Sequence, residues 1–197
     1  MTAALTGLRA SELRGLRWSD IDLKACELHV RQRADRFCKI GAPKSEASRR
    51  SVPVDSSMLL PALKAWKIAC PITAADLVFP TALGEIAHHE AVLRSLEPIM
   101  AAAGVMVSVK DASGAAVLDK SGQPQLEPKY ALHAFRHFFA SWCINPKERG
   151  GRELPPKVVQ QLLGHGSIVM TLDRYGHLFP RGDDRNELSK AVGVLLA

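Results

Sequence analysis

Near its beginning the chain reads TGLRASEL (residues 6–13), and this stretch governs how the first third of the sequence folds. Leucines on both sides of Thr6-Gly7 recur at roughly one-turn spacings, which predicts helical structure up to about Trp18. The Thr6-Gly7 pair interrupts that pattern, and we expect Ser11 to cap a second short helix. The leucines are Leu5, Leu8, Leu13 and Leu16.

Arg9 lies at this glycine-loosened junction, where a guanidinium can point inward instead of lying on a solvated face. Glu12 follows three residues later and is close enough to hold it. Taken alone, the pair is more typical of a surface ion pair that contributes less than about 1 kcal/mol.

The composition fits one soluble domain. The chain has 197 residues, of which 47% are hydrophobic and 23% charged, and its formal charge of +6 suits a polyanionic partner without proving one. The four cysteines are scattered without a CxxC pair, which argues against a zinc ribbon or a disulfide scaffold. No apolar run approaches the roughly 20 residues of a membrane span, and no secretion signal is visible. We therefore expect a cytoplasmic protein.

The remaining pattern predicts an α+β fold that is mainly helical, with a small antiparallel ribbon in the N-terminal third. Strands are expected over residues 26–33 and 50–54 around a turn at 40–45, and a hairpin or long loop over 105–129. A mobile connection is expected at 145–154. Helices are expected from Ser56 or Ser57 to 69, then over 88–103, 132–143 and 155–163, and from about 184, with Leu188, Ala191, Val192 and Leu195 on one face.

A second motif reads LHAFRH (residues 132–137). His133 and Arg136 share a helix face, so a planar fork of donors could meet a phosphate beside a group that titrates near neutral pH. The alternative interpretation, a helix whose basic residues simply lie on its solvent-exposed face, remains open. A metal pair of His133 and His137 is disfavoured, because Ala134 replaces the glutamate of HExxH and Arg136 would place a positive charge beside the metal.

A third motif reads LLGHGS (residues 162–167), with Tyr175 ten residues beyond His165. A short helix over 167–174 would return Tyr175 towards the histidine, although a buried tyrosine with a hydrogen-bonded hydroxyl is the ordinary alternative. The fourth feature is Lys44, in the turn between the two predicted strands, where most lysines are simply solvated.

In combination, these segments resemble the catalytic motifs of the tyrosine recombinases, the phage-integrase family. The matching text runs from Thr6 to about Phe179 and comprises TGLRASELRGLRWSDID, PKSEASRRSVPV, LHAFRHFFASW and LGHGSIVMTLDRYGHLF. It looks closest to the integrases of phages and genomic islands, and hence to proteins of mobile genetic elements. The resemblance implies a DNA breaking-and-rejoining catalytic domain over residues 1–197, with Arg9, Lys44, His133, Arg136, His165 and Tyr175 as its catalytic set.

The resemblance also implies a mechanism. Tyr175 would attack a DNA phosphodiester and form a 3′-phosphotyrosyl link, while Arg9 and Arg136 stabilise the charge that develops. His165 would donate to the phosphate, His133 would accept or shuttle the tyrosine proton, and Lys44 would protonate the departing 5′ oxygen. Glu12 would orient Arg9. No metal, ATP or other cofactor is expected.

The expected partner is double-stranded DNA, and the implied setting is the bacterial or phage-derived nucleoid. Cations that could follow the DNA backbone cluster in residues 31–50. They are Arg31, Arg33, Arg36, Lys39, Arg49 and Arg50. The resemblance further implies a homotetramer on DNA in which the C-terminal helix docks on a neighbouring protomer, although that helix could equally cover its own core.

The chain departs from the family in beginning at its first motif. The N-terminal DNA-binding domain and the first catalytic-domain helix of family members are absent from this sequence. Two alternatives to an active recombinase therefore stay open: an impaired DNA-binding or assembly remnant, and a DNA relaxer resembling type IB topoisomerases.

Overall fold

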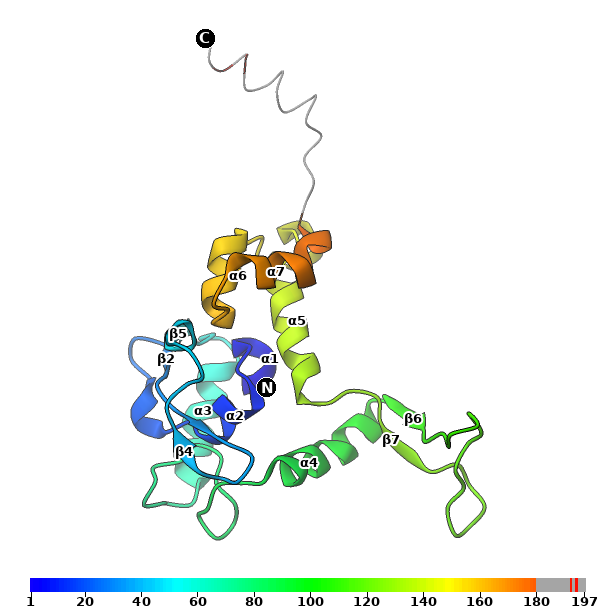
Figure 1. Cartoon of the computed structure of the whole chain (residues 1–197). Coiled ribbons are helices and arrows are strands. Elements are labelled where there is room, and N and C mark those ends of the chain that lie inside the picture. The colour runs from blue at the N-terminus through cyan, green and yellow to red at the C-terminus, as the bar shows by residue number, and fades with distance from the viewer. Residues whose placement is uncertain (180–191, 193, 195–197) are drawn as a thin grey trace.

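A computed structural model describes residues 1–179 together with 192 and 194 (Figure 1). The helices in this part are α1 (Thr2–Thr6), α2 (Ala10–Arg14), α3 (Leu59–Ala69), α4 (His89–Ala102), α5 (Leu132–Ile144), α6 (Pro156–Leu163) and α7 (Ile168–Tyr175). The strands are β1 (Ile21–Asp22), β2 (Glu27–Val30), β3 (Arg33–Ala34), β4 (Ile40–Gly41), β5 (Arg50–Pro53), β6 (Met106–Ser108) and β7 (Leu126–Pro128). Short 3₁₀ turns are η1 (Trp18–Asp20), η2 (Glu46–Ser48), η3 (Lys147–Arg149) and η4 (Gly176–Leu178).

The N-terminal half packs helices α1 to α3 around a three-stranded antiparallel sheet of order β1-β2-β5. In the β2–β5 register Leu28 lies opposite Val52, and both side chains are fully buried. Alternate residues of a strand face opposite sides of a sheet, so β2 buries Leu28 and Val30 on one face and leaves His29 partly exposed on the other.

The C-terminal half is a second core formed by α5, α6 and α7, with Phe139 and Leu163 fully buried at its centre. Helix α4 links the two halves in sequence, and the β6–β7 hairpin extends away from the body of the molecule (Figure 1). Among the described residues, no helix combines the length and the apolar character that a membrane span requires.

The α+β class and the hairpin within residues 105–129 are confirmed. The strand expected over 26–33 is instead two strands, because β3 leaves β2 to pair with β4 in a separate small sheet. The expected caps are wrong. Arg9, not Ser11, precedes the first turn of α2, and the Asp55 carboxylate accepts from the first amides of α3.

Residues 145–154, expected as a mobile connection, are held by hydrogen bonds. The Leu154 amide donates to the Cys143 carbonyl at 2.8 Å, and the Trp142 indole donates to the Gly150 carbonyl at 3.0 Å. The helix expected from about residue 184 lies outside the described residues, apart from 192 and 194.

The two halves meet where α1 packs against α5, and Gly7 lies against Phe139 in this contact. Its φ of +62° ends α1, and a Cβ at this position would overlap the ring of Phe139. Its carbonyl accepts a hydrogen bond from Arg136 of α5 at 2.7 Å. The turn therefore needs glycine both for its left-handed backbone and for the space that the aromatic ring occupies.

We expect Gly7→Ala to lower the free energy of unfolding by about 3 kcal/mol, because it adds overpacking to the strain of a left-handed alanine. Gly104→Ala is the matched control: its φ is +66°, and a Cβ there meets open space among the described residues. The control should cost only about 1 kcal/mol. Urea denaturation of both variants measures the difference, and equal losses would contradict the packing explanation.

Candidate functional site

Three arginines from three distant segments converge on the carboxyl end of α6. Gly164 ends this helix with a φ of +63°, so its last carbonyls have no partner within the helix. Arg50 Nε donates to the Leu162 carbonyl at 2.7 Å, and Arg9 Nη2 donates to the Gly164 carbonyl at 3.0 Å. Between these, Arg136 Nη2 donates to the Leu163 carbonyl. Three consecutive carbonyls thus each accept from one guanidinium.

Glu12 is the anion that holds this cluster. Its side chain is 2% exposed; Oε2 lies 2.9 Å from Arg50 Nη2, and Oε1 lies 2.8 Å from Arg9 Nη1. Burial acts to raise the pKa of Glu12, but the hydrogen bonds and charges of Arg50 and Arg9 outweigh it, so the pKa lies below its usual value. One carboxylate faces three guanidiniums, and the cluster therefore carries a net positive charge.

Arg136 is the most deeply placed of the three. Its second amino group donates to the Gly7 carbonyl, so this side chain ties the α1–α2 turn to the end of α6. Burial, followed by the charges of Arg9 and Arg50, lowers the pKa of Arg136 to about 9. The guanidinium remains protonated at neutral pH, and an anion placed beside it would be strongly attracted.

His165 follows the end of α6 and turns back into the same region. Its Nδ1 lies 2.9 Å from Thr171 Oγ1. Burial, together with the positive charges of Arg136, Arg9 and Arg50, lowers the pKa of His165 to about 4, so the imidazole is neutral at pH 7. A neutral ring has one N–H, and a hydrogen bond to Thr171 at Nδ1 leaves Nε2 as the second polar atom of the ring.

Tyr175, the last residue of α7, is 4% exposed. Burial raises its pKa, and the nearby charges of Arg136 and Arg174 oppose that shift without cancelling it. The hydroxyl is therefore protonated at neutral pH.

The Tyr175 hydroxyl lies 2.7 Å from Nδ1 of His137. The resemblance implies instead that His133 accepts or shuttles the proton of this hydroxyl. His133 is exposed and meets His137 edge-on, with ring centroids 4.7 Å apart. The sequence signal that could have identified His137 is its i, i+4 spacing from His133. In the sequence that spacing indicates only a metal pair, which is disfavoured.

Lys44 is exposed, in the segment between β4 and η2. Its neighbour Ser45 lies 3.0 Å, oxygen to oxygen, from Ser48, and Ser48 Oγ lies 3.4 Å from Arg9 Nη1. The loop that carries Lys44 is therefore linked to the arginine cluster through Ser45 and Ser48, and the lysine side chain itself is exposed to solvent.

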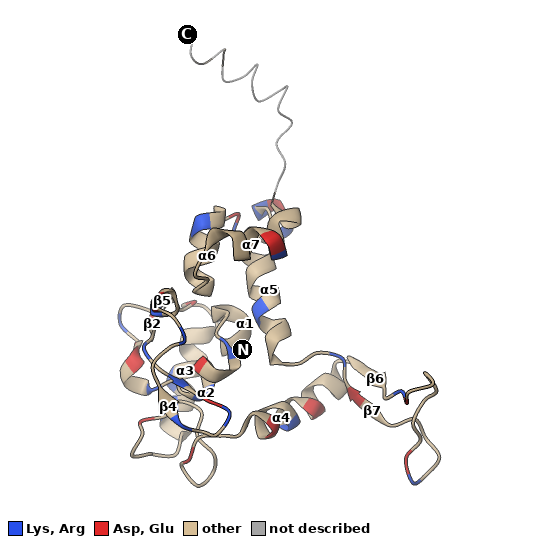
Figure 2. Ribbon diagram, viewed as in Figure 1, with Lys and Arg blue, Asp and Glu red and all other residues tan. Residues whose placement is uncertain are grey.

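The cations of residues 31–50, blue on the ribbon of Figure 2, differ in how far their side chains are buried. Arg31, Arg36, Lys39 and Arg49 are exposed, and Arg33 is half-buried against the Ala42 carbonyl. Arg50 does not belong with them, because its side chain is 5% exposed and paired with Glu12. Its expected place along a DNA backbone is corrected: Arg50 is part of the buried cluster.

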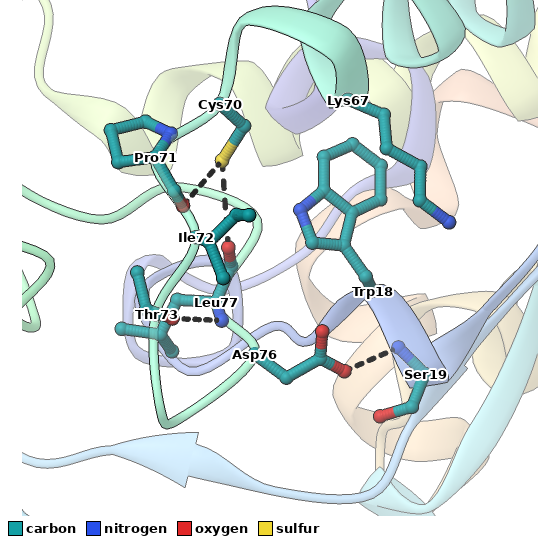
Figure 3. Close-up of a pocket in the computed structure, with 9 residues that line it drawn as sticks. All are labelled: Trp18, Ser19, Lys67, Cys70, Pro71, Ile72, Thr73, Asp76 and Leu77. Carbon is teal, nitrogen blue, oxygen red and sulfur yellow. Dashed lines mark hydrogen bonds between the residues drawn. The ribbon is translucent and has the colours of Figure 1, made fainter.

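Within the described residues, no group of three or more His, Cys, Asp or Glu side chains is arranged to hold a metal ion. A pocket of about 380 Å³ lies elsewhere, between η1 and the segment after α3 (Figure 3). There the Asp76 carboxylate accepts from the Ser19 amide at 2.8 Å, and Lys67 lies over the Trp18 ring. The arginine cluster does not line this pocket.

Similarity to known proteins supports the same interpretation of the arginine cluster as the geometry does. The family model described as "Phage integrase family" matches residues 1–181. This chain belongs to the phage integrase family. The match covers α1 to α7, and thus every element that contributes to the cluster.

Among curated relatives, this integrase-family chain is 30% identical over 200 residues to a "Tyrosine recombinase XerC-like" protein of Caldanaerobacter subterraneus subsp. tengcongensis, covering 89% of the chain and 44% of the relative. It is 29% identical to the "ICEBs1 integrase" of Bacillus subtilis, covering 98% of the chain and 47% of the relative. The chain thus spans less than half the length of these relatives.

Solved structures share its fold. The integrase of transposon Tn1549, in complex with circular intermediate DNA, superposes with a TM-score of 0.64 at 20% identity, covering 96% of this chain and 57% of the other. XerA recombinase superposes with a TM-score of 0.60 at 21% identity, covering 92% and 57%.

We expect Glu12→Gln to destabilise the chain by about 3 kcal/mol at pH 7, because it leaves buried guanidiniums without their carboxylate. The pKa of Glu12 is lowered in the folded state, so its contribution is fully present above the usual value of 4.5 and is lost as the pH falls through the lower folded value. Denaturation at several pH values should show the difference from wild type shrinking below pH 4.5. Glu97→Gln, on the exposed face of α4, is the control. A difference independent of pH would contradict this account.

Proposed function

We propose that this chain is the catalytic domain of a site-specific tyrosine recombinase, in which Tyr175 attacks a DNA phosphodiester. The observation that carries the proposal is the convergence of Arg9, Arg136, His165 and Tyr175 around a region with excess positive charge. Membership of the integrase family supports it independently.

The charge balance suits a phosphodiester. Glu12 neutralises one of three guanidiniums, so a bound phosphate would supply part of the missing negative charge. As the Tyr175 oxygen bonds to phosphorus, charge grows on the non-bridging oxygens, and donors fixed in advance stabilise that state more than the ground state. Arg9 and Arg136 are fixed in advance by carbonyls of the protein itself.

The remaining members have defined roles in this scheme. With the Thr171 hydroxyl, 2.9 Å away, as donor to Nδ1, the neutral His165 ring would carry its proton on Nε2 and donate it to a phosphate oxygen. His133, exposed at the start of α5, shuttles protons near the reacting groups. Lys44 acts as general acid on the departing 5′ oxygen, and the exposed position of its loop permits that approach.

The reaction forms one phosphoester bond for each one that it breaks, so it needs no external energy source. The Tyr175 oxygen–phosphorus bond forms, the phosphorus–O5′ bond breaks, the phenol loses its proton and O5′ gains one. A phosphotyrosine conserves the ester, and a different 5′ hydroxyl can reverse the step to join new partners. This exchange needs neither ATP nor a metal ion.

The proposed partner is double-stranded DNA. The exposed cations Arg31, Arg36, Lys39 and Arg49, with Arg33 beside them, would contact its backbone without reading its sequence. We also propose a homotetramer on DNA in which C-terminal segments are exchanged, and association with the nucleoid. The DNA-bound state of the Tn1549 integrase and the curated names of the relatives support the DNA partner.

The proposed chemistry is tested with duplexes that carry random sequence around a nick a few nucleotides beyond the scissile phosphate, so that the cleaved fragment diffuses away. Wild type should form a covalent protein–DNA adduct, resistant to denaturant and insensitive to EDTA, and Tyr175→Phe should form none. Absence of an adduct from wild type would favour the impaired remnant. Supercoil relaxation without joined products would favour the relaxer.

The two clamping arginines should each be needed for rate. Arg9→Lys and Arg136→Lys keep a positive charge but lose the planar fork, and we expect adduct formation to fall by roughly 10²–10³. The rate is measured in single-turnover conditions at saturating protein. Arg94→Lys, a matched change at an exposed arginine of α4 outside the proposed DNA contacts, should leave the saturated rate near wild type. Similar losses in all three would contradict a specific clamp.

Lys44 should become dispensable when the leaving group needs no proton. Lys44→Ala is expected to slow cleavage of an ordinary phosphodiester by about 10²-fold or more. Replacing the bridging 5′ oxygen with sulfur gives a leaving group that departs as a thiolate, and the variant should then react nearly as fast as wild type. A defect that persists with the sulfur substrate would show that Lys44 positions DNA instead.

A further inference from the structure

Arg174, His137 and Tyr175 form a chain of side chains that the proposed mechanism does not use. Arg174 Nη1 lies 3.3 Å from Nε2 of His137, and Nδ1 of the same ring lies 2.7 Å from the Tyr175 hydroxyl oxygen. Arg174 and Tyr175 are the last two residues of α7, while His137 lies on α5. Both nitrogens of one imidazole are thus engaged by neighbouring residues of a single helix.

The direction of these hydrogen bonds follows from the donor inventory. A guanidinium has only N–H donors, so His137 Nε2 must accept from Arg174. A neutral imidazole carries one proton, and with Nε2 as acceptor that proton sits on Nδ1. The Nδ1–H group therefore donates to the oxygen of Tyr175, and His137 is not placed to accept the phenol proton.

The surroundings of His137 keep it neutral. Burial lowers its pKa, and the positive charges of Arg174 and Arg136 lower it further. His133 meets the ring edge-on from the preceding turn of α5. The nearby surface that α1 and α4 contribute is apolar, formed by Ala4 and Met100. Arginine cations and a neutral histidine therefore face this ring, and its single proton remains fixed towards the tyrosine.

We propose that Arg174 and His137 form a hydrogen-bond relay that stabilises the negative charge of the Tyr175 phenolate. The relay rests on the proposed function for its purpose but not for its geometry. Arg174 is the positioning residue, because it sets the tautomer of His137, and His137 touches the reacting oxygen. The proton that Tyr175 loses passes by way of solvent to His133, the proton shuttle of the proposed mechanism, and not to His137.

The relay serves both directions of strand exchange. During cleavage, the Tyr175 oxygen gains negative character as its proton leaves, and it holds that charge until its bond to phosphorus is complete. During rejoining, the phosphorus–oxygen bond breaks and the phenolate departs with the electron pair. A donor aimed at this oxygen stabilises its negative charge in both situations.

The tautomer is tested without DNA. Long-range ¹H–¹⁵N correlation of the ¹⁵N-labelled 197-residue chain distinguishes protonated from unprotonated ring nitrogens, and the His137 signals are assigned by their loss in His137→Asn. We expect the Nδ1–H tautomer in wild type and a shift towards the Nε2–H form in Arg174→Gln. Arg149→Gln, an exposed arginine on η3, should leave the tautomer unchanged. An Nε2–H tautomer in wild type would overturn the relay.

The phenol itself gives a second readout. The chain has two tyrosines, so a Tyr130→Phe background leaves Tyr175 as the single group whose tyrosinate absorbance titrates. Loss of the donor in His137→Ala should raise the pKa of Tyr175 by about one unit relative to that background. His137→Asn, whose amide nitrogen can replace Nδ1–H, should restore most of the difference. A fall in pKa on removing His137 would mean that the ring accepts the proton, and would overturn the proposal.

Activity separates the relay from the wider function. In the nicked-duplex assay, we expect His137→Ala to slow adduct formation by about 10- to 100-fold at unchanged DNA affinity, with partial rescue by His137→Asn. If wild type forms no adduct while the tautomer and titration results hold, the recombinase function fails and the relay stands. If wild type reacts and His137→Ala reacts equally fast, the relay has no catalytic role.

Discussion

The end of α6 organises this molecule. Its last three carbonyls, those of Leu162, Leu163 and Gly164, each accept from one arginine. The three arginines come from the α1–α2 turn, from β5 and from α5. Helix carboxyl ends carry partial negative charge and unpaired acceptors, so they suit guanidiniums. One helix terminus thereby joins both cores and fixes the cationic cluster before any substrate arrives.

That arrangement has an electrostatic consequence for every neighbouring group. Burial, reinforced by the neighbouring positive charges, lowers the pKa of His165 to about 4 and that of Arg136 to about 9. At Tyr175 the positive charges instead oppose the burial that raises the pKa. The site therefore has several hydrogen-bond donors in place, but its positive charges outnumber its negative ones. A phosphodiester corrects that imbalance, and its non-bridging oxygens gain further charge during the reaction, so the same cations favour the transition state over the bound substrate.

Much of this could be read from the sequence, and the exceptions share a cause. The turn at Gly7, the pairing of Arg9 with Glu12 and the helix carrying His133 and Arg136 depend on local spacing, which periodicity captures. Arg50 looked like one more cation in a basic segment, because nothing within its own strand reveals that Glu12, 38 residues earlier, is its partner. Local spacing likewise does not reveal that His137 contacts the Tyr175 hydroxyl, since this contact depends on how α7 lies against α5.

The donor role of His137 follows from the same excess of arginine. A base beside Tyr175 would need a free lone pair directed at the phenol. The lone pair of the His137 ring instead accepts a hydrogen bond from a guanidinium, that of Arg174. Cationic surroundings thus convert histidine from a proton acceptor into a donor while keeping it neutral. Such a donor lowers the energy of the charged oxygen whether that oxygen is attacking or leaving, so it assists cleavage and rejoining through the transition state that they share.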